Sequence, residues 1–142
     1  MRAGVAGVGH LGYHHARILK TLTDEVTIYD TDPERLDKVA TELGVRASGS
    51  LEELMDTADL IDVSCTTSAH YDVVLKAIEK GKPVLVEKPL AATVEQGTEM
   101  VSRAQEKGVP LVVGHIERFN PAITAAGDLI MDPIFMEGHR MA

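Results

Sequence analysis

The sequence predicts an α/β protein with a doubly wound, six-stranded parallel sheet in the order 3-2-1-4-5-6. Short apolar strand patterns alternate with helical patterns along all 142 residues, as in a chain of βα units. Segment 60–65 is nearly all apolar, which is typical of a strand buried on both faces of a parallel sheet. The first strand also runs directly into a glycine-rich turn, and right-handed crossovers then give the stated strand order.

The glycine-rich turn has the spacing GxGxxG, with Gly7, Gly9 and Gly12. Gly7 permits a sharp turn, Gly9 lets the backbone approach a pyrophosphate, and Gly12 lets the following helix pack closely. His10 and Leu11 lie in the first turn of that helix, whose unpaired N–H groups would face the phosphates. The motif predicts a dinucleotide site, although glycine-rich turns also occur without one.

Asp30 supplies the second half of a dinucleotide fingerprint. It ends an alternating strand pattern over 25–30 and lies 18 residues after Gly12, close to the spacing of a ribose-binding acid. Its carboxylate would accept hydrogen bonds from the adenosine ribose and repel a 2′-phosphate, which favours NAD over NADP. The alternative is that Asp30 only opens the turn that continues through Thr31, Asp32 and Pro33.

Composition narrows the class of protein. The formal net charge of −8 argues against a nucleic-acid partner or a membrane-surface partner. Hydrophobic residues make up 44% and charged residues 25%, as in an ordinary soluble domain. We expect a cytoplasmic protein, because the chain begins with a strand pattern rather than a leader. Its single cysteine, Cys65, excludes an internal disulfide.

Capping residues set the other expected boundaries. Asp32 and Pro33 begin one helix, Ser50 and Glu53 form a capping box, and Thr93 caps a later helix. The expected helices cover 10–22, 33–43, a brief stretch from 51, 69–80 capped by Thr67 or Ser68, 94–107, and 122–130 after an Asn120 cap. The remaining expected strands cover 45–47, 83–86 and 109–114.

Two units are expected. Residues 1–121 form the nucleotide-binding Rossmann domain, and 122–142 form a linking helix and the first strand of a second domain. Because the final stretch, PIFMEGHRMA, reads as a strand that barely begins, we expect a truncated two-domain enzyme whose second α+β domain is missing.

Four segments together resemble the N-terminal domain of the Gfo/Idh/MocA dehydrogenase family over essentially the whole chain. They are GVGHLGYHH, TTSAH, VLVEKPL and VVGHIERFNP. The resemblance implies an NAD-dependent oxidoreductase that exchanges hydride with a sugar hydroxyl. The HIERFNP segment is most similar to the branch that acts on UDP-N-acetylhexosamines and their uronates. The resemblance also implies a homo-oligomer for the full-length protein.

The resemblance assigns site residues as well. Lys88 matches the lysine of the family's EKP motif and is the expected catalytic and cofactor-binding residue, where burial would lower its pKa. Glu87 is expected near the nicotinamide ribose, or else paired with Lys88 or capping a loop. Thr66, Thr67 and His70 match the cofactor turn after the fourth strand, with Thr66–Thr67 replacing the more usual Thr-Pro. Local packing is the alternative for His70.

Other polar residues near the proposed site have open roles. Arg118 and Asn120 are expected to approach the nicotinamide or a substrate diphosphate, although Asn120 alternatively serves as a helix cap. His14 and His15 point about 100° apart on a helix and cannot share one ion, so we expect no metal. His15 matches the family's histidine after the glycines and is expected to pack or to form hydrogen bonds.

The fragment is expected to bind NAD and to be inactive alone. The alternative function is a non-catalytic, NAD(H)-sensing regulatory Rossmann module. Such a module would need the glycines and Asp30, but not the EKP motif or the segment from Arg118 to Pro121. These two segments therefore favour the enzyme.

Overall fold

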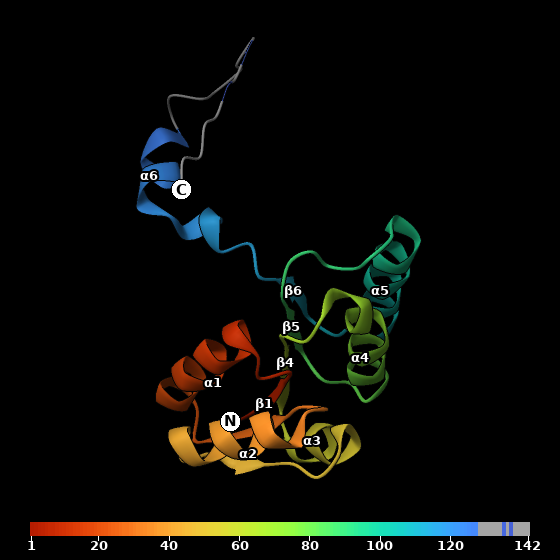
Figure 1. Ribbon diagram of the computed structural model, residues 1–142. Helices are drawn as coiled ribbons and strands as arrows, with labels where there is room; N and C mark the ends of the chain where they lie inside the picture. The colour runs from red at the N-terminus through yellow and green to blue at the C-terminus, as the bar shows by residue number, and fades with distance from the viewer. Residues whose placement is uncertain (128–134, 136, 138–142) are drawn as a thin grey trace.

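Six parallel strands form one sheet in the computed structural model, which describes residues 1–127, 135 and 137 (Figure 1). The strand order is β3-β2-β1-β4-β5-β6, and every neighbouring pair is parallel. The predicted fold class and strand order are therefore confirmed. The strands are β1 (Arg2–Ala6), β2 (Glu25–Tyr29), β3 (Arg46–Ala47), β4 (Leu60–Val63), β5 (Val84–Val86) and β6 (Leu111–Val113).

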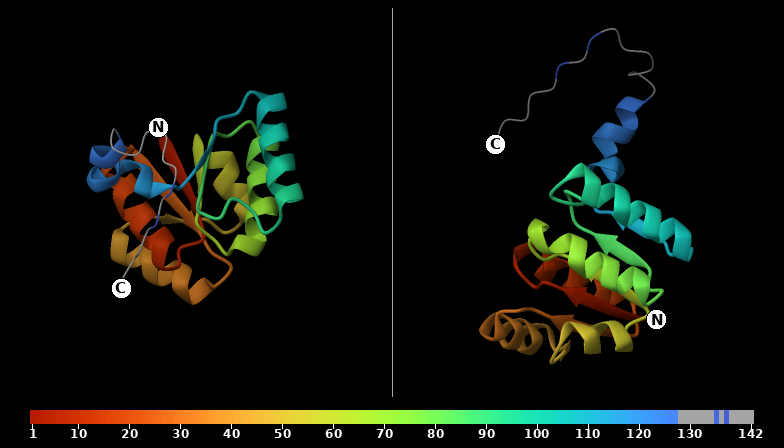
Figure 2. Two further views of the ribbon diagram at one scale, coloured as in Figure 1. Left: turned by 90° about the horizontal axis from the view of Figure 1, so that it is seen from above. Right: turned by 90° about the vertical axis from the view of Figure 1, so that its right-hand side faces the viewer.

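Helices cover both faces of the sheet, with α1 and α2 on one side and α4 and α5 on the other (Figures 1 and 2). The elements are α1 (His10–Leu22), α2 (Pro33–Leu43), α3 (Leu51–Thr57), α4 (Thr67–Glu79), α5 (Val94–Lys107), the 3-10 helix η1 (Ile116–Phe119) and α6 (Pro121–Ala126). Within the described ranges, none of these helices is long and apolar enough to cross a bilayer.

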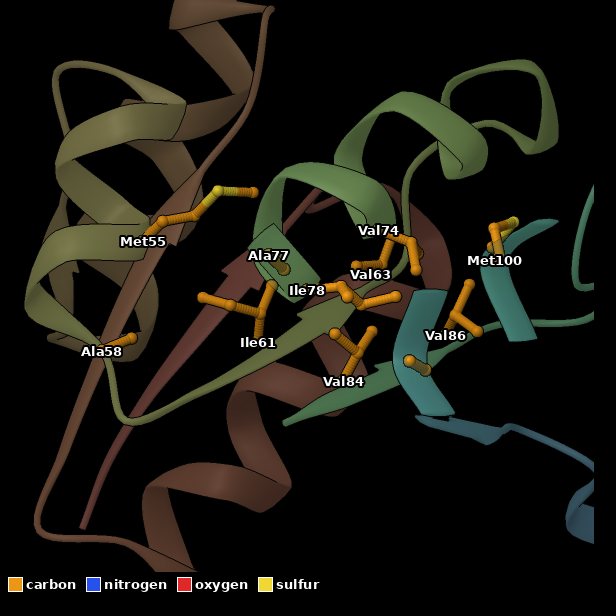
Figure 3. Close-up of a cluster of buried hydrophobic side chains, with 11 residues drawn as sticks. Met55, Ala58, Ile61, Val63, Val74, Ala77, Ile78, Val84, Val86 and Met100 are labelled. Carbon is orange, nitrogen blue, oxygen red and sulfur yellow. The ribbon is translucent and has the colours of Figure 1, made fainter. Parts of the chain in front are cut away.

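The core consists of one apolar cluster on each face of the sheet. On the α4 side, Ile61 and Val63 of β4 pack with Val74 and Ile78 of α4 and Met100 of α5, all fully buried. Figure 3 shows these side chains meeting between the strands and the helices. On the other face, α1 and α2 pack on β1 and β2. Nearly all residues of β1 and β4 are buried, so helices cover these two central strands on both faces.

Three helix starts follow the predicted caps. The side chains of Asp32, Ser50 and Thr93 accept backbone N–H groups three residues later, at 3.1, 3.0 and 3.3 Å. The reciprocal half of the capping box differs, because Glu53 Oε2 accepts the N–H of Gly49 at 2.9 Å rather than that of Ser50.

The start of α4 differs from the prediction. The helix begins at Thr67 rather than at residue 69, and Thr66 occupies the cap position without a side-chain cap bond. The hydroxyls of Thr66 and Ser68 lie 3.3 Å apart and pair with each other instead. Neither predicted capping residue therefore caps the helix.

Several strands end earlier than predicted. The fourth strand ends at Val63 rather than at residue 65, and Ser64 and Cys65, which follow it, line a cleft. The sixth strand is likewise Leu111–Val113 rather than 109–114. The final helix begins at Pro121 as predicted. Its expected end at 128–130 and the expected terminal strand lie outside the described residues, apart from positions 135 and 137.

Candidate cofactor site

A cleft of about 350 Å³ opens at the carboxyl ends of β1, β2 and β4. Gly7 and Gly9 lie on one wall, Asp30 and Arg35 on a second, and Cys65 on a third. Open α/β sheets bind ligands at this edge, where the strand order reverses between β1 and β4. The sheet thus brings together the two halves of the predicted fingerprint.

The three glycines have different environments. Gly7 has a φ of +93°, and a Cβ there would lie 2.5 Å from Cys65 Cα. A Cβ on Gly12 would lie 1.9 Å from the Gly7 carbonyl oxygen, so Gly12 permits the close approach of α1 to the turn. Gly9 has an ordinary φ of −64°, and a Cβ there would meet no heavy atom within 4 Å. Since Gly9 lines the cleft, its missing side chain leaves room for a ligand rather than for protein.

Asp30 joins β2 to the glycine turn. It is 8% exposed, and its Oδ2 accepts the backbone N–H of Val8 at 2.8 Å while its Oδ1 accepts that of Asp32 at 2.9 Å. Asp30 therefore opens the turn to Asp32, as the alternative interpretation predicts, and it also lines the cleft.

Arg35 also contacts the Asp30 carboxylate. Its Nη1 lies 3.2 and 3.3 Å from the two oxygens of Asp30, and its Nη2 lies 2.9 Å from Asp32 Oδ2. Two carboxylates and one guanidinium leave this cluster with a net charge of −1. This residual negative charge disfavours the 2′-phosphate that distinguishes NADP from NAD.

A polar network connects α1 to β4 and to the end of β5. His15 Nδ1 lies 2.8 Å from Asp62 Oδ2, and His15 Nε2 lies 3.2 Å from Glu87 Oε1. Ser64 Oγ donates to Asp62 Oδ1 at 2.5 Å and lies 3.1 Å from His15 Nδ1. The hydrogen bond to Asp62 raises the pKa of His15, and the charges of Asp62 and Glu87 act in the same direction against burial. His15 therefore forms hydrogen bonds, as expected.

The EKP segment follows β5 directly. Glu87 is buried, whereas Lys88 is exposed, so the burial expected for Lys88 is not found. The backbone N–H of Lys88 donates to Glu87 Oε2 at 3.1 Å. The Lys88–Pro89 peptide bond is cis. Lys88 thus stands at the carboxyl end of a strand two places from β1 in the sheet, on the edge that carries the cleft.

His70 is fully buried and connects two loops. Its Nδ1 lies 3.0 Å from the Pro89 carbonyl oxygen and its Nε2 lies 3.2 Å from the Cys65 carbonyl oxygen. The imidazole therefore ties the loop after β4 to the EKP turn. This is the packing alternative considered for His70, and direct contact with a cofactor stays a prediction.

Four of the other predicted residues belong to the turns that border the cleft or to the helices that follow them. Thr66 lines the cleft, and Thr67 lies next to it in the first turn of α4. His10 and Leu11 lie exposed in the first turn of α1.

Arg118 and Asn120 do not line the cleft. Arg118 lies in η1, and Asn120 follows η1 directly. Asn120 Oδ1 accepts the Ala122 N–H at 3.0 Å, so it caps α6. The approach of Arg118 and Asn120 to a ligand stays a prediction.

Residues 1–115 match the model of the Gfo/Idh/MocA family, described as an oxidoreductase family with an NAD-binding Rossmann fold. The chain belongs to this family. NAD is accordingly its cofactor, and the open face of Gly9 and the acid at Asp30 fit that group.

Similar Gfo/Idh/MocA proteins include sugar dehydrogenases. The chain is 35% identical to UDP-N-acetylglucosamine 3-dehydrogenase of Acidithiobacillus ferrooxidans over 143 aligned positions, covering 100% of this chain and 46% of the relative. It is 36% identical to scyllo-inositol 2-dehydrogenase (NAD(+)) of Bacillus subtilis, covering 89% of this chain and 39% of the relative.

Solved structures agree with the family assignment. The A. ferrooxidans enzyme, GnnA, superposes with a TM-score of 0.87, covering 92% of this chain and 42% of that one. GenD2 from gentamicin A biosynthesis, in complex with NAD, superposes with a TM-score of 0.84 at 29% identity, covering 93% of this chain and 39% of that one. The chain thus spans less than half the length of these relatives.

Sequence reasoning missed three polar residues of this Gfo/Idh/MocA domain. Asp62 interrupts the apolar run of β4, and a lone acid in a buried strand signals a buried partner. Ser64, two residues later, gave no comparable signal. Arg35 follows Asp32 by three residues on a helix, the spacing at which side chains become neighbours.

Proposed function

We propose that this domain belongs to an NAD(H)-dependent oxidoreductase that transfers hydride between a sugar hydroxyl and nicotinamide. The observation that carries the proposal is the cleft formed by Gly9, Asp30 and the end of β4, with the EKP lysine on the same edge of the sheet. Bound NAD would supply the hydride acceptor. The chain's own residues bind and orient the reactants and handle the hydroxyl proton.

Lys88 is the proposed catalytic residue. Its exposed ammonium follows β5, and its backbone is fixed from two sides, by the Glu87 carboxylate and by the His70 bond to Pro89. A positioned ammonium can donate a hydrogen bond to the reacting oxygen and ease loss of the hydroxyl proton. The C–H hydride would pass to the nicotinamide and the O–H proton to a base or to water, so that the sugar alcohol becomes a ketone.

A nucleotide sugar is the substrate class we propose. Support comes from the 35% identity to a UDP-N-acetylglucosamine 3-dehydrogenase. The same resemblance supports Arg118 and Asn120 as candidates for contact with the substrate diphosphate. Arginine suits that role because its fork of N–H groups matches phosphate oxygens.

A second, α+β domain completes the enzyme in this proposal, with residues 122–142 as its first part. Apolar side chains after the sheet edge support it, since Val112 is 56%, Ile116 70%, Phe119 82% and Ile123 52% exposed. Several exposed large apolar side chains on neighbouring segments are typical of a surface that another part of a protein covers. We therefore infer that the fragment binds NAD without turnover, and that the full-length protein is a cytoplasmic homo-oligomer.

The test is a Lys88→Ala variant of the full-length protein, assayed with UDP-N-acetylglucosamine and NAD. Turnover should fall by about 10² to 10⁴, the usual contribution of a positioned proton-transfer group, while NAD affinity changes little. Lys82→Ala is the matched control, because Lys82 is a lysine near β5 that donates to the Ala58 carbonyl away from the cleft. Equal turnover in wild type and Lys88→Ala would contradict the proposal.

A non-catalytic NAD(H)-sensing module is the second candidate. The cleft itself favours it as much as it favours an enzyme, because both need a nucleotide site. A sensor would bind NAD with the same affinity in the Lys88→Ala variant and would show no turnover of any sugar in the wild type. The same assay therefore separates the two functions.

A further inference from the structure

We infer that His15 is a positioning residue, doubly protonated at pH 7, that clamps Glu87 and thereby fixes the backbone that carries Lys88. The inference rests on the proposed function only for its catalytic consequence. The clamp itself is a property of α1, β4 and β5 in this domain.

The positions of the two carboxylates favour a doubly protonated ring. Both nitrogens of His15 face carboxylate oxygens, Asp62 Oδ2 at 2.8 Å and Glu87 Oε1 at 3.2 Å. Neutral imidazole carries one N–H, so it would present a lone pair to one of the two acids. An imidazolium donates to both, and charge-assisted bonds of this kind are the stronger ones.

Burial makes this arrangement costly to break. Asp62 is 1% and Glu87 7% exposed, and an unpaired buried carboxylate is strongly disfavoured. The charged and titratable groups facing the ring are Asp62 from β4 and Glu87 after β5, with the Ser64 hydroxyl beside Asp62. The raised pKa of His15 agrees with this environment.

Glu87 links His15 to Lys88 through its two carboxylate oxygens. Its Oε1 points at His15, while its Oε2 accepts the Lys88 N–H at 3.1 Å. The third side of the carboxylate is closed by Gly114, where a Cβ would come within 2.9 Å of Oε1. The carboxylate is thus located by α1, by its own neighbour and by the residue that follows β6, and loss of His15 removes the first of these three constraints.

Two NMR readouts on this chain test the clamp without any cofactor. The first is the protonation of the His15 ring nitrogens as a function of pH, with the resonance identified by its loss in His15→Gln. The second is the backbone amide of Lys88, which reports its bond to Glu87. His14→Gln is the matched control, because His14 is the neighbouring residue and its ring contacts those of His10 and Tyr13 instead.

The expected result is that His15 keeps both hydrogens to a higher pH than an ordinary histidine side chain, whose pKa is about 6.5, and that Asp62→Asn lowers the midpoint of His15. The Lys88 amide should shift with the same midpoint in wild type and in His14→Gln, and should lose that step in His15→Gln. A His15 ring with one bare nitrogen at pH 7, or a Lys88 amide step that survives in His15→Gln, would overturn the inference.

The catalytic consequence is measured in the full-length protein. His15→Gln should lower kcat by roughly threefold to thirtyfold, the range expected for a residue that acts through a network, with little change in KM. This decrease in kcat should equal the decrease that wild type shows when the pH rises above the midpoint of His15 titration. If wild type neither binds NAD nor turns over, the proposed function fails, whereas the NMR readouts still decide the clamp.

Discussion

The Asp30 carboxylate accepts the backbone N–H of Val8 at 2.8 Å, and this bond joins the acid that ends β2 to the glycine turn that follows β1. One side chain therefore shapes the turn and also lines the cleft. Its replacement should affect both the fold and the cofactor.

We predict that Asp30→Ala weakens NAD binding and also lowers the free energy of unfolding by about 1–3 kcal/mol, because the buried N–H of Val8 loses its acceptor. Asp30→Asn retains an acceptor oxygen and should cost less stability while still narrowing the preference for NAD over NADP. Calorimetry with both nucleotides and urea unfolding measure the two effects. An Asp30→Asn variant with the wild-type ratio of affinities would show that the carboxylate charge does not select the cofactor.

Gly9 and Gly12 should separate binding from folding. Gly9→Ala places its methyl group in open space, so its unfolding free energy should stay within about 0.5 kcal/mol of wild type while NAD affinity falls by roughly tenfold or more. Gly12→Ala drives a methyl group into the Gly7 carbonyl and should cost about 3 kcal/mol. Thermal unfolding and NAD titration of both variants provide the check. Unaltered NAD affinity in Gly9→Ala would mean that no ligand passes close to this backbone.

His15 should make stability depend on pH. The pKa of His15 is raised in the folded protein, above the value of about 6.5 expected in the unfolded chain. Its stabilisation is therefore complete below about pH 6.5 and is lost as the pH rises through the folded pKa.

His15→Gln should accordingly be less stable than wild type by about 3 kcal/mol at pH 6, with a smaller difference at pH 9. Urea unfolding at both values measures the change, and His14→Gln serves as the control. A difference that grows with pH would have the wrong sign for a protonated ring.

Cys65 gives a chemical probe of the cleft. Burial raises the pKa of this thiol to about 11, and the residue lines the cleft. Alkylation by iodoacetamide should be slow at pH 7 and should accelerate as the pH approaches 11, because the thiolate is the nucleophile. NAD at a concentration that just saturates wild type should slow the alkylation of wild type, and it should slow that of Gly9→Ala much less. Equal rates with and without NAD, at a concentration that calorimetry shows to be saturating, would place the ligand elsewhere.

Local patterns predicted the parts of the fold that depend on neighbours in sequence. The turn at Gly7 and the caps at Asp32 and Asn120 depend on side chains a few residues apart, and the structure places them as predicted. Strand ends were less predictable, because Ser64 and Cys65 are as compatible with a strand as with a cleft wall. Only the packing of neighbouring elements decides where the ladder stops.

The candidate site was predictable where a motif marks it and not where the fold assembles it. Gly9 and Asp30 belong to a fingerprint whose spacing is visible in the sequence. His15 and Asp62 are 47 residues apart, and no local pattern connects a helix residue to an acid on a central strand. The sheet order brings them together, so their partnership becomes visible only in three dimensions.

The most direct test of the account is a calorimetric titration of this chain with NAD and, separately, with NADP. The account predicts a single site that binds NAD more tightly than NADP, and whose affinity for NAD falls by roughly tenfold or more in Gly9→Ala while the variant remains folded. Binding of neither nucleotide, or tighter binding of NADP, would contradict it.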